Sequence, residues 1–192
     1  MKSIKYFIRK YGRRIKAYYY RKKYHLKYVS KTSYFCGPLE NISKDLVTED
    51  YTYIGPYCRI YPKTRINKFS ILANNVSIIG SDHSIDVVGL PIYLSGREKL
   101  ESTVIGSDCW VGAHVIIKCG VKIADGCVIA MGSVVTKNTE PYGIYAGVPA
   151  KRIRERFCNP GDVERHRKKI SEISPIDAEE YILGCEKLPN YK

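Results

Sequence analysis

The chain has 192 residues, of which 44% are apolar and 27% charged, and these fractions predict one folded domain with a buried core rather than a disordered chain. Its formal net charge of +13 would by itself suggest a nucleic-acid or membrane partner. No apolar run reaches the roughly 18 residues of a membrane span, and the basic N-terminus lacks the apolar segment of a signal peptide, so we expect a cytoplasmic protein.

The positive charge is concentrated in residues 1–31, a basic arm that holds 12 of the 32 Lys and Arg residues and no Asp or Glu. Apolar side chains recur there at spacings of three, four and seven residues, which predicts an amphipathic helix: Ile4, Phe7, Ile8, Tyr11, Ile15, Tyr18 and Tyr19. Such a helix suits an anionic membrane surface, and packing on the body of the protein explains the pattern as well. We expect no nucleic-acid partner, because no motif for one is present.

The rest of the chain up to residue 157 is dominated by a six-residue period. Branched aliphatic residues stand at every sixth position in two registers: Ile54, Ile60, Ile66, Leu72 and Ile78, then Ile105, Val111, Ile117, Ile123, Ile129 and Val135. Four places after these stand small or compact residues: Cys58, Thr64, Ser70, Val76 and Asp82, then Cys109, Val115, Val121, Cys127 and Ser133. Short strands joined by tight corners, stacked coil on coil, would bury both positions, so the period predicts a parallel β-helix.

This pattern resembles the hexapeptide-repeat acyltransferases, in the branch of sugar O-acetyltransferases and xenobiotic acetyltransferases. The resemblance covers roughly residues 42–157 and is most specific over residues 105–114, 130–137 and 141–153. It implies an all-β, left-handed parallel β-helix with three hexapeptides per coil, a homotrimer, and acetyl-CoA as co-substrate. We therefore divide the chain into the arm (1–31), the acyltransferase domain (32–157) and a helical tail (158–192).

With three hexapeptides per coil, residues 18 apart stack on neighbouring coils, which places Cys109 over Cys127. The seven Cys residues are an odd number and form no CxxC pair, so we expect free thiols that fill a narrow core in a reducing compartment.

The repeat is interrupted after Ile78, and a loop over residues 84–102 follows before the second register begins. Long loops on regular scaffolds are more often functional than accidental. In the family, a His at the root of such a loop is the general base, and His83 occupies that place. Imidazole titrates close to neutral pH, as this chemistry needs. Asp82 or a loop carbonyl could orient the second ring nitrogen, and Asp82 could instead mark the corner where the loop leaves.

The resemblance also assigns the acetyl-CoA site, in a groove between subunits near the C-terminal coils. Trp110 would pack beside the thioester of acetyl-CoA. The backbone groups of Ala113, Met131 and Gly132 would form hydrogen bonds with its pantetheine chain. Met131 departs from the small residue usual there. The remaining candidates are Thr136 and Lys137, near the pantetheine and pyrophosphate, and Lys151 and Arg154, on the CoA phosphates.

A zinc carbonic anhydrase of similar shape is a rival that the His residues exclude. Three His on adjacent coils would be needed, and only His83 and His114 lie in the repeats; His25 is in the arm and His166 in the tail. We expect no metal site, and His114 on the surface.

Two helices are expected in the tail. Asn159-Pro160 would start one that carries residues 162–170, and Ser174 to Asp177 resembles a capping box for another that stops at Gly184. We expect them to cap an open end of the solenoid.

These observations predict an acetyl-CoA-dependent O-acetyltransferase that acts on a sugar hydroxyl, in surface polysaccharide synthesis, with an arm that could contact the inner membrane face. Transfer would be direct, with His83 as the base and a backbone amide as the oxyanion donor. No covalent acyl-enzyme is needed, and the sequence places no partner His beside Cys119 to form a thiolate. The alternatives are N-acetylation of a nucleotide-linked amino sugar, O-acetylation of an antibiotic, and a non-catalytic β-helix that only binds or assembles.

Overall fold

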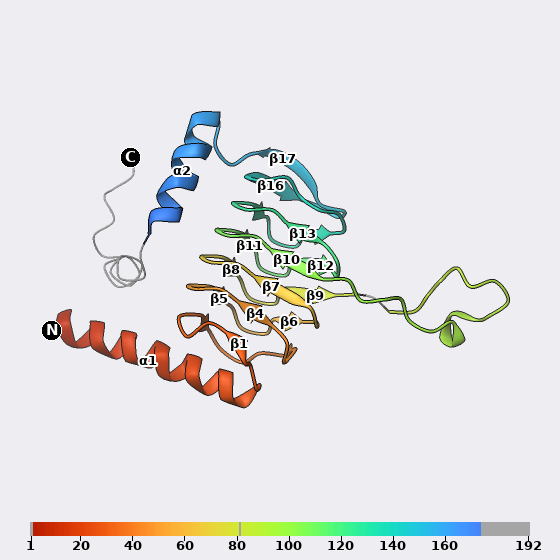
Figure 1. Cartoon of the computed structure of the whole chain (residues 1–192), viewed down its shortest axis with the longest axis horizontal. Helices are drawn as coiled ribbons and strands as arrows, with labels where there is room; N and C mark the ends of the chain where they lie inside the picture. Colours follow the sequence, from red (N-terminus) through yellow and green to blue (C-terminus); the bar gives the residue numbers. More distant parts are fainter. Residues whose placement is uncertain (1, 81, 174–192) are drawn as a thin grey trace.

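A computed structural model describes residues 2–80 and 82–173, with side chains from residue 11 onward. The chain forms a solenoid of about six coils, with one helix across its first coil, another beside its last coils, and one loop that projects far from the body (Figure 1). Each coil visits three parallel sheets in turn, which gives the body a three-sided cross-section.

The three sheets are built from strands of two to five residues. The strands of the first sheet lie in the order β1 (Tyr28–Val29), β4 (Val47–Thr48), β7 (Thr64–Ile66), β10 (Thr103–Ile105) and β13 (Lys122–Ile123). Those of the second lie in the order β2 (Tyr34–Phe35), β5 (Tyr53–Ile54), β8 (Ile71–Leu72), β11 (Trp110–Val111), β14 (Val128–Ile129), β16 (Gly143–Ala146) and β17 (Lys151–Glu155). Those of the third lie in the order β3 (Asn41–Ile42), β6 (Arg59–Ile60), β9 (Ser77–Ile79), β12 (Ile116–Lys118) and β15 (Val134–Val135). All pairs are parallel except β16 with β17, and the predicted parallel β-helix is therefore confirmed.

The core is a single column along the solenoid. All eleven aliphatic positions of the period are at most 2% exposed, and nine of the ten compact positions are buried with them. Asp82 is the exception: it was expected to point inward and is exposed, because the chain has already left the coil. Cys109 and Cys127 are buried free thiols, as predicted.

The stacking register follows the predicted spacing of 18 residues, as in Tyr53 with Ile71 and Trp110 with Val128. Two insertions break it, and in the last coil the spacing shortens to 16, with Val128 paired to Ile144. An extra residue near Gly37, whose φ is +120°, makes Tyr34 pair with Tyr53. The projecting loop makes Ile71 pair with Trp110, yet the strands on both sides keep their places in the sheets.

Helix α1 (Lys2–Lys23) confirms the helix expected in the arm, and it packs across the first coil through Ala17, Tyr20 and, beyond the helix, Leu26. The solenoid itself begins at Tyr28, so its first strand lies within residues 1–31, before the boundary expected at residue 32. No helix in the part of the chain that the structure describes is both long enough and apolar enough to cross a membrane.

Helix α2 (Pro160–Glu172) begins where the tail motif predicted, with the Asn159 side chain accepting a hydrogen bond from the Gly161 amide at 3.0 Å. It does not cover the end of the solenoid but lies against a corner, where His166 Nε2 and Asp108 Oδ2 are 2.8 Å apart. The second helix expected in the tail, from Ser174 to Gly184, lies outside the described residues.

Candidate active site

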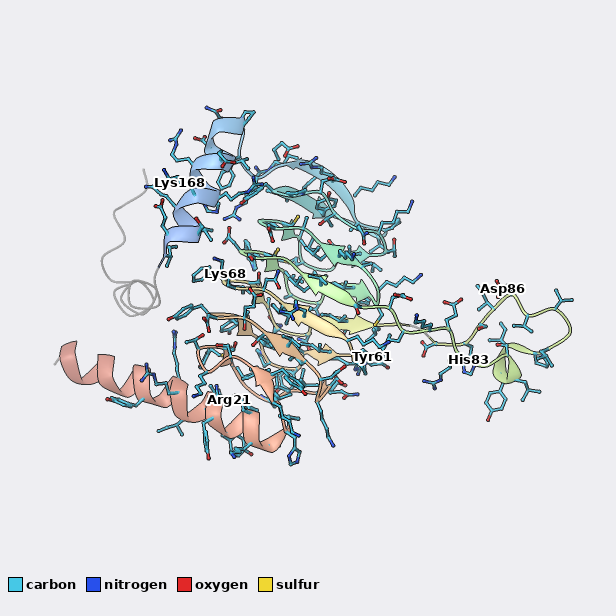
Figure 2. All side chains as sticks on the ribbon, viewed as in Figure 1. Arg21, Tyr61, Lys68, His83, Asp86 and Lys168 are labelled. Atoms are coloured by element: carbon cyan, nitrogen blue, oxygen red, sulfur yellow. The ribbon has the colours of Figure 1, made fainter. Side chains whose placement is uncertain are left out.

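The projecting loop leaves the solenoid at the end of β9 and returns at β10, and His83 stands at its root (Figures 1 and 2). An isolated antiparallel bridge joins His83 to Arg97 across the base of the loop. The His83 ring is half-buried and faces Tyr93, from the short η1 helix (Ile92–Leu94), with the ring centroids 6.4 Å apart and 27° between the planes. The imidazole is thus held in place by its own loop.

One ring nitrogen of His83, Nδ1, is enclosed without a hydrogen-bond partner among the described residues. Asp82, one of the two groups expected to orient it, uses its backbone carbonyl to accept from the Glu98 amide at 3.3 Å. The sequence left open which group orients the ring, and no partner for Nδ1 is present in the described chain.

The outer part of the loop is almost wholly exposed and carries many apolar side chains. Seven of them are at least 40% exposed: Ile85, Val87, Val88, Leu90, Ile92, Tyr93 and Leu94. Apolar surface of this extent is typical of a contact with a partner or a ligand.

Thr136 and Lys137 follow the carboxyl end of β15 and are exposed. The loop departs from the carboxyl end of β9 in the same sheet, so both lie at the corner between the third and first sheets. Lys118, at the end of β12, lies between them and the loop root, because it pairs with Ile79. Sequence reasoning did not select Lys118 or Tyr93.

Trp110 and the expected pantetheine contacts lie at a different part of the surface. Trp110 projects from the second sheet with 56% of its surface exposed. Ala113, Met131 and Gly132 occupy the corner between the second and third sheets, where the Gly132 amide donates to the Ala113 carbonyl at 2.9 Å. Met131 is 79% exposed, and a Cβ built on Gly132 would meet nothing within 4 Å. This corner therefore has open space beside exposed backbone, which an extended amide chain such as pantetheine requires.

Close packing of the coils holds that corner in shape. A Cβ on Gly112 would lie 2.7 Å from the Met131 amide nitrogen, so only glycine lets the two coils approach this closely. Met131 is thereby kept at the surface of the next coil.

The expected phosphate contacts come from β17, which folds back on β16. Lys151 and Arg154 are exposed on it. The turn before β17 is tied to the third sheet, because the Val134 amide donates to the Gly147 carbonyl at 3.0 Å and the Ala150 amide donates to the Val134 carbonyl at 2.8 Å. Exposed cations near the last coils are suited to the phosphates of CoA.

Within one chain, six of the candidates form two groups, and Trp110, Lys151 and Arg154 lie outside both. His83, Thr136 and Lys137 share the edge between the third and first sheets, whereas Ala113, Met131 and Gly132 share the corner between the second and third. Trp110 stands on a third surface, and His114 is exposed, as expected. Among the described residues, no three His, Cys, Asp or Glu side chains gather as a metal site would require.

A family model described as bacterial transferase hexapeptide (six repeats) matches residues 102–137. A probable macrolide acetyltransferase of Lysinibacillus sphaericus is 39% identical over an alignment of 130 residues, which covers 60% of this chain and 69% of that protein. The chain belongs to the hexapeptide-repeat acyltransferase family. As a member of this family, it is an acetyl-CoA-dependent O-acetyltransferase.

Two solved structures show the same architecture as this hexapeptide-repeat acyltransferase. A maltose O-acetyltransferase from Clostridium difficile 630 is 29% identical, with a TM-score of 0.56 over 67% of each chain. A hexapeptide-repeat acetyltransferase of Vibrio cholerae, solved with acetyl-CoA, is 22% identical, with a TM-score of 0.60 over 73% of this chain and 78% of that one. At 22% identity, the second likeness concerns the fold alone.

Proposed function

We propose that this enzyme transfers the acetyl group of acetyl-CoA to a sugar hydroxyl, with His83 as the general base. The observation that carries the proposal is the place of His83: a half-buried imidazole at the root of the projecting loop, held by the bridge to Arg97 and facing Tyr93. A base must sit at a fixed position beside the acceptor, and the loop would supply that acceptor's surroundings.

In the proposed reaction, His83 takes the proton from the acceptor hydroxyl through a ring nitrogen. The hydroxyl oxygen forms a bond to the acetyl carbonyl carbon, the bond from that carbon to sulfur breaks, and CoA leaves as its thiol with the proton that His83 returns. General-base catalysis of this kind contributes about 10²–10⁴-fold in rate.

No covalent acyl-enzyme is needed, and the thiol nearest the site is a poor candidate for one. The Cys119 amide donates to the Ile79 carbonyl at 2.9 Å, beside the loop root. Burial raises the pKa of the Cys119 thiol above its ordinary value, although a hydrogen bond with Thr103 opposes the shift. A protonated thiol is a weak nucleophile.

Acetyl-CoA would lie along the corner of Ala113, Met131 and Gly132, with Trp110 walling the thioester and Thr136 and Lys137 near the pantetheine and pyrophosphate. Lys151 and Arg154 would contact the phosphates. The open space at Gly132 and the exposed cations of β17 support this placement.

We further propose that the enzyme is a homotrimer, because the two groups of candidates lie at different edges of one chain. The outer face of the second sheet supports this: it presents an apolar side chain on every strand from β2 to β16, namely Tyr34, Tyr53, Ile71, Trp110, Val128 and Ile144. The other two sheets interleave charged or polar residues. A continuous apolar face is what a second copy of the chain would cover.

Our first candidate for the acceptor is a sugar of a surface-polysaccharide precursor, which would be acetylated in the cytoplasm. The second candidate is a macrolide hydroxyl, which the name of the Lysinibacillus relative and the apolar loop favour. Acetyl-CoA consumption with sugars, nucleotide-linked amino sugars and macrolides, followed by mass mapping of the product, separates them. Faster turnover with an amine or a macrolide would replace the sugar proposal, and binding of all three classes without turnover would indicate a non-catalytic scaffold.

The base is tested with His83→Ala. We expect the acetyl-transfer rate to fall at least about 10²-fold while CoA binding, measured by calorimetry, is retained. His25→Asn is the matched control: His25 is exposed at the far end of the solenoid, with a φ of +54° that Asn tolerates. The assignment is wrong if turnover of His83→Ala equals that of the control.

A further inference from the structure

Helix α1 has apolar side chains on two sides, and only one side is used by the fold. Ala17 and Tyr20 are 2% and 7% exposed, and the Tyr20 ring packs on Phe35 of β2 with the centroids 5.8 Å apart. In contrast, Ile15, Tyr18 and Tyr19 are 68%, 57% and 54% exposed. The second set has no role in closing the first coil.

The two sets lie on opposite faces by helix geometry. At 100° per residue, Ile15 is about 160° from Ala17, and Tyr19 lies one turn beyond Ile15 on the same side. The exposed set therefore forms a stripe that points away from the solenoid, along the outer surface of α1. Figure 1 shows α1 crossing the end of the molecule, so that this stripe faces outward from that end.

Cations surround the stripe. The Lys22 ammonium lies 5.8 Å from the centre of the Tyr18 ring, and that of Lys23 lies 5.7 Å from the centre of the Tyr19 ring. Helix α1 contains no acidic residue. Two acids of the adjoining coils are already paired, Glu40 with Arg59 and Glu49 with Arg65, so they compensate little of the charge on α1.

We propose that the outer face of α1 docks on an anionic phospholipid bilayer. Its apolar stripe would enter the boundary between headgroups and acyl chains, and the flanking lysines would reach the lipid phosphates. A nucleic acid is a poorer fit, because the same face exposes the apolar side chains of Ile15, Tyr18 and Tyr19, for which a phosphate backbone offers no apolar partner. An ordinary solvated helix would carry polar residues on its outer side.

The test is flotation of the full chain with vesicles of phosphatidylcholine alone and of phosphatidylcholine with 30% phosphatidylglycerol. We expect the chain to float with the anionic vesicles only, and less in 0.5 M NaCl. Lys22→Glu with Lys23→Glu should weaken binding at least about 30-fold, since each basic residue near such a surface contributes roughly fivefold. Ile15→Ser with Tyr19→Ser should also weaken it while leaving the charge unchanged.

Lys168→Glu with Lys169→Glu on α2 is the matched control, because it makes the same change of charge on another exposed helix. It should float like the unchanged chain, and all the variants should acetylate a soluble acceptor at the same rate. Equal flotation with neutral vesicles, or equal loss in the control, would overturn the proposal. Two other outcomes would also overturn it, because each assigns the outer face of α1 to another partner. One is a larger protein assembly that dissociates when Ile15 and Tyr19 are replaced by Ser. The other is tight binding of RNA that is lost in the α1 lysine variant.

Discussion

Buried cysteines serve as small apolar residues in this solenoid. Burial raises the pKa of the Cys58 thiol to about 11 and that of the Cys109 thiol to about 12, from an ordinary value near 9. Cys58 and Cys109 also donate to backbone carbonyls of the next coil, those of Ala73 and Ala124. These thiols stay protonated in the folded state at any physiological pH.

Thiol labelling should therefore be strongly selective. At pH 8 we expect iodoacetamide to modify the exposed Cys158 at least about 100-fold faster than Cys58, because Cys58 is buried and a pKa two units above the ordinary thiol value lowers its thiolate fraction by that factor. Mass spectrometry of peptides after timed quenching measures the two rates, and Cys158→Ser should leave the slow rate at Cys58 unchanged. Equally fast labelling of Cys58 in the folded chain would contradict this.

The sign of the pH effect on stability follows from the same shifts. Because the folded thiols have raised pKa values, the unfolded chain loses its thiol protons first as the pH rises above about 9. Their contribution to the free energy of unfolding is complete below pH 9 and is lost between pH 9 and about 12.

At the level of residues, the period predicted the buried positions well because side-chain direction in a short strand follows from sequence spacing alone. The inward direction did not hold at Asp82, where the chain leaves the coil, which is the alternative that the sequence offered for this residue. The period did not select Tyr93, because the packing of a loop side chain on His83 depends on a path that no repeat encodes. The roles of His83 and of the acetyl-CoA contacts remain predictions.

Among the elements, α2 is joined to the solenoid by one carboxylate. Asp108 Oδ2 accepts from Arg156 Nη1 at 2.6 Å and lies 2.8 Å from His166 Nε2. The His166 ring also contacts Phe157 and Tyr142, with centroid distances of 4.9 and 6.0 Å. With α2 carrying no buried residue, this cluster accounts for its position.

Asp108→Asn should loosen α2 without unfolding the coils. Asn tolerates the φ of +54° at this position but removes the charge, and hydrogen bonds to charged groups contribute about 1.5–3 kcal/mol. We expect amide exchange in α2 to accelerate at least about tenfold, with exchange in β11 and β14 unchanged. Glu164→Gln, which removes an exposed pair with Arg167, is the control and should change little. Equal acceleration in both variants would mean that Asp108 does not hold the helix.

The sequence predicted both helices, because their signals are local: an apolar spacing for α1, and Asn159-Pro160 for α2. It did not predict where α2 docks, since His166 and Asp108 are 58 residues apart and neither belongs to a pattern. The start of the solenoid was placed late because the extra residue near Gly37 breaks the period in the first coil, so that the buried Val29 and Phe35 fall out of phase with Ile54.

At the scale of the whole molecule, the proposed trimer would form through the apolar outer face of the second sheet, and a charge placed there should disrupt it. Ile71 is 42% exposed on β8, next to Trp110. Ile71→Asp would place a charge within the apolar face, and we expect sedimentation to shift from three copies of the 21.9-kDa chain toward one, with loss of activity. Lys122→Asp, exposed on the first sheet, is the control and should stay trimeric. The trimer proposal is wrong if the unchanged protein sediments as a single chain and is active.

The projecting loop leaves from β9 and returns at β10, and both strands keep their partners in neighbouring coils. Its outer side chains contribute almost nothing to the core. Substitutions, insertions and deletions there would therefore be nearly neutral for folding, while they would alter the surroundings of the acceptor directly. Selection could thus change what the enzyme acetylates at little cost in stability, and exchanging this segment between relatives is a practical route to enzymes with new acceptors.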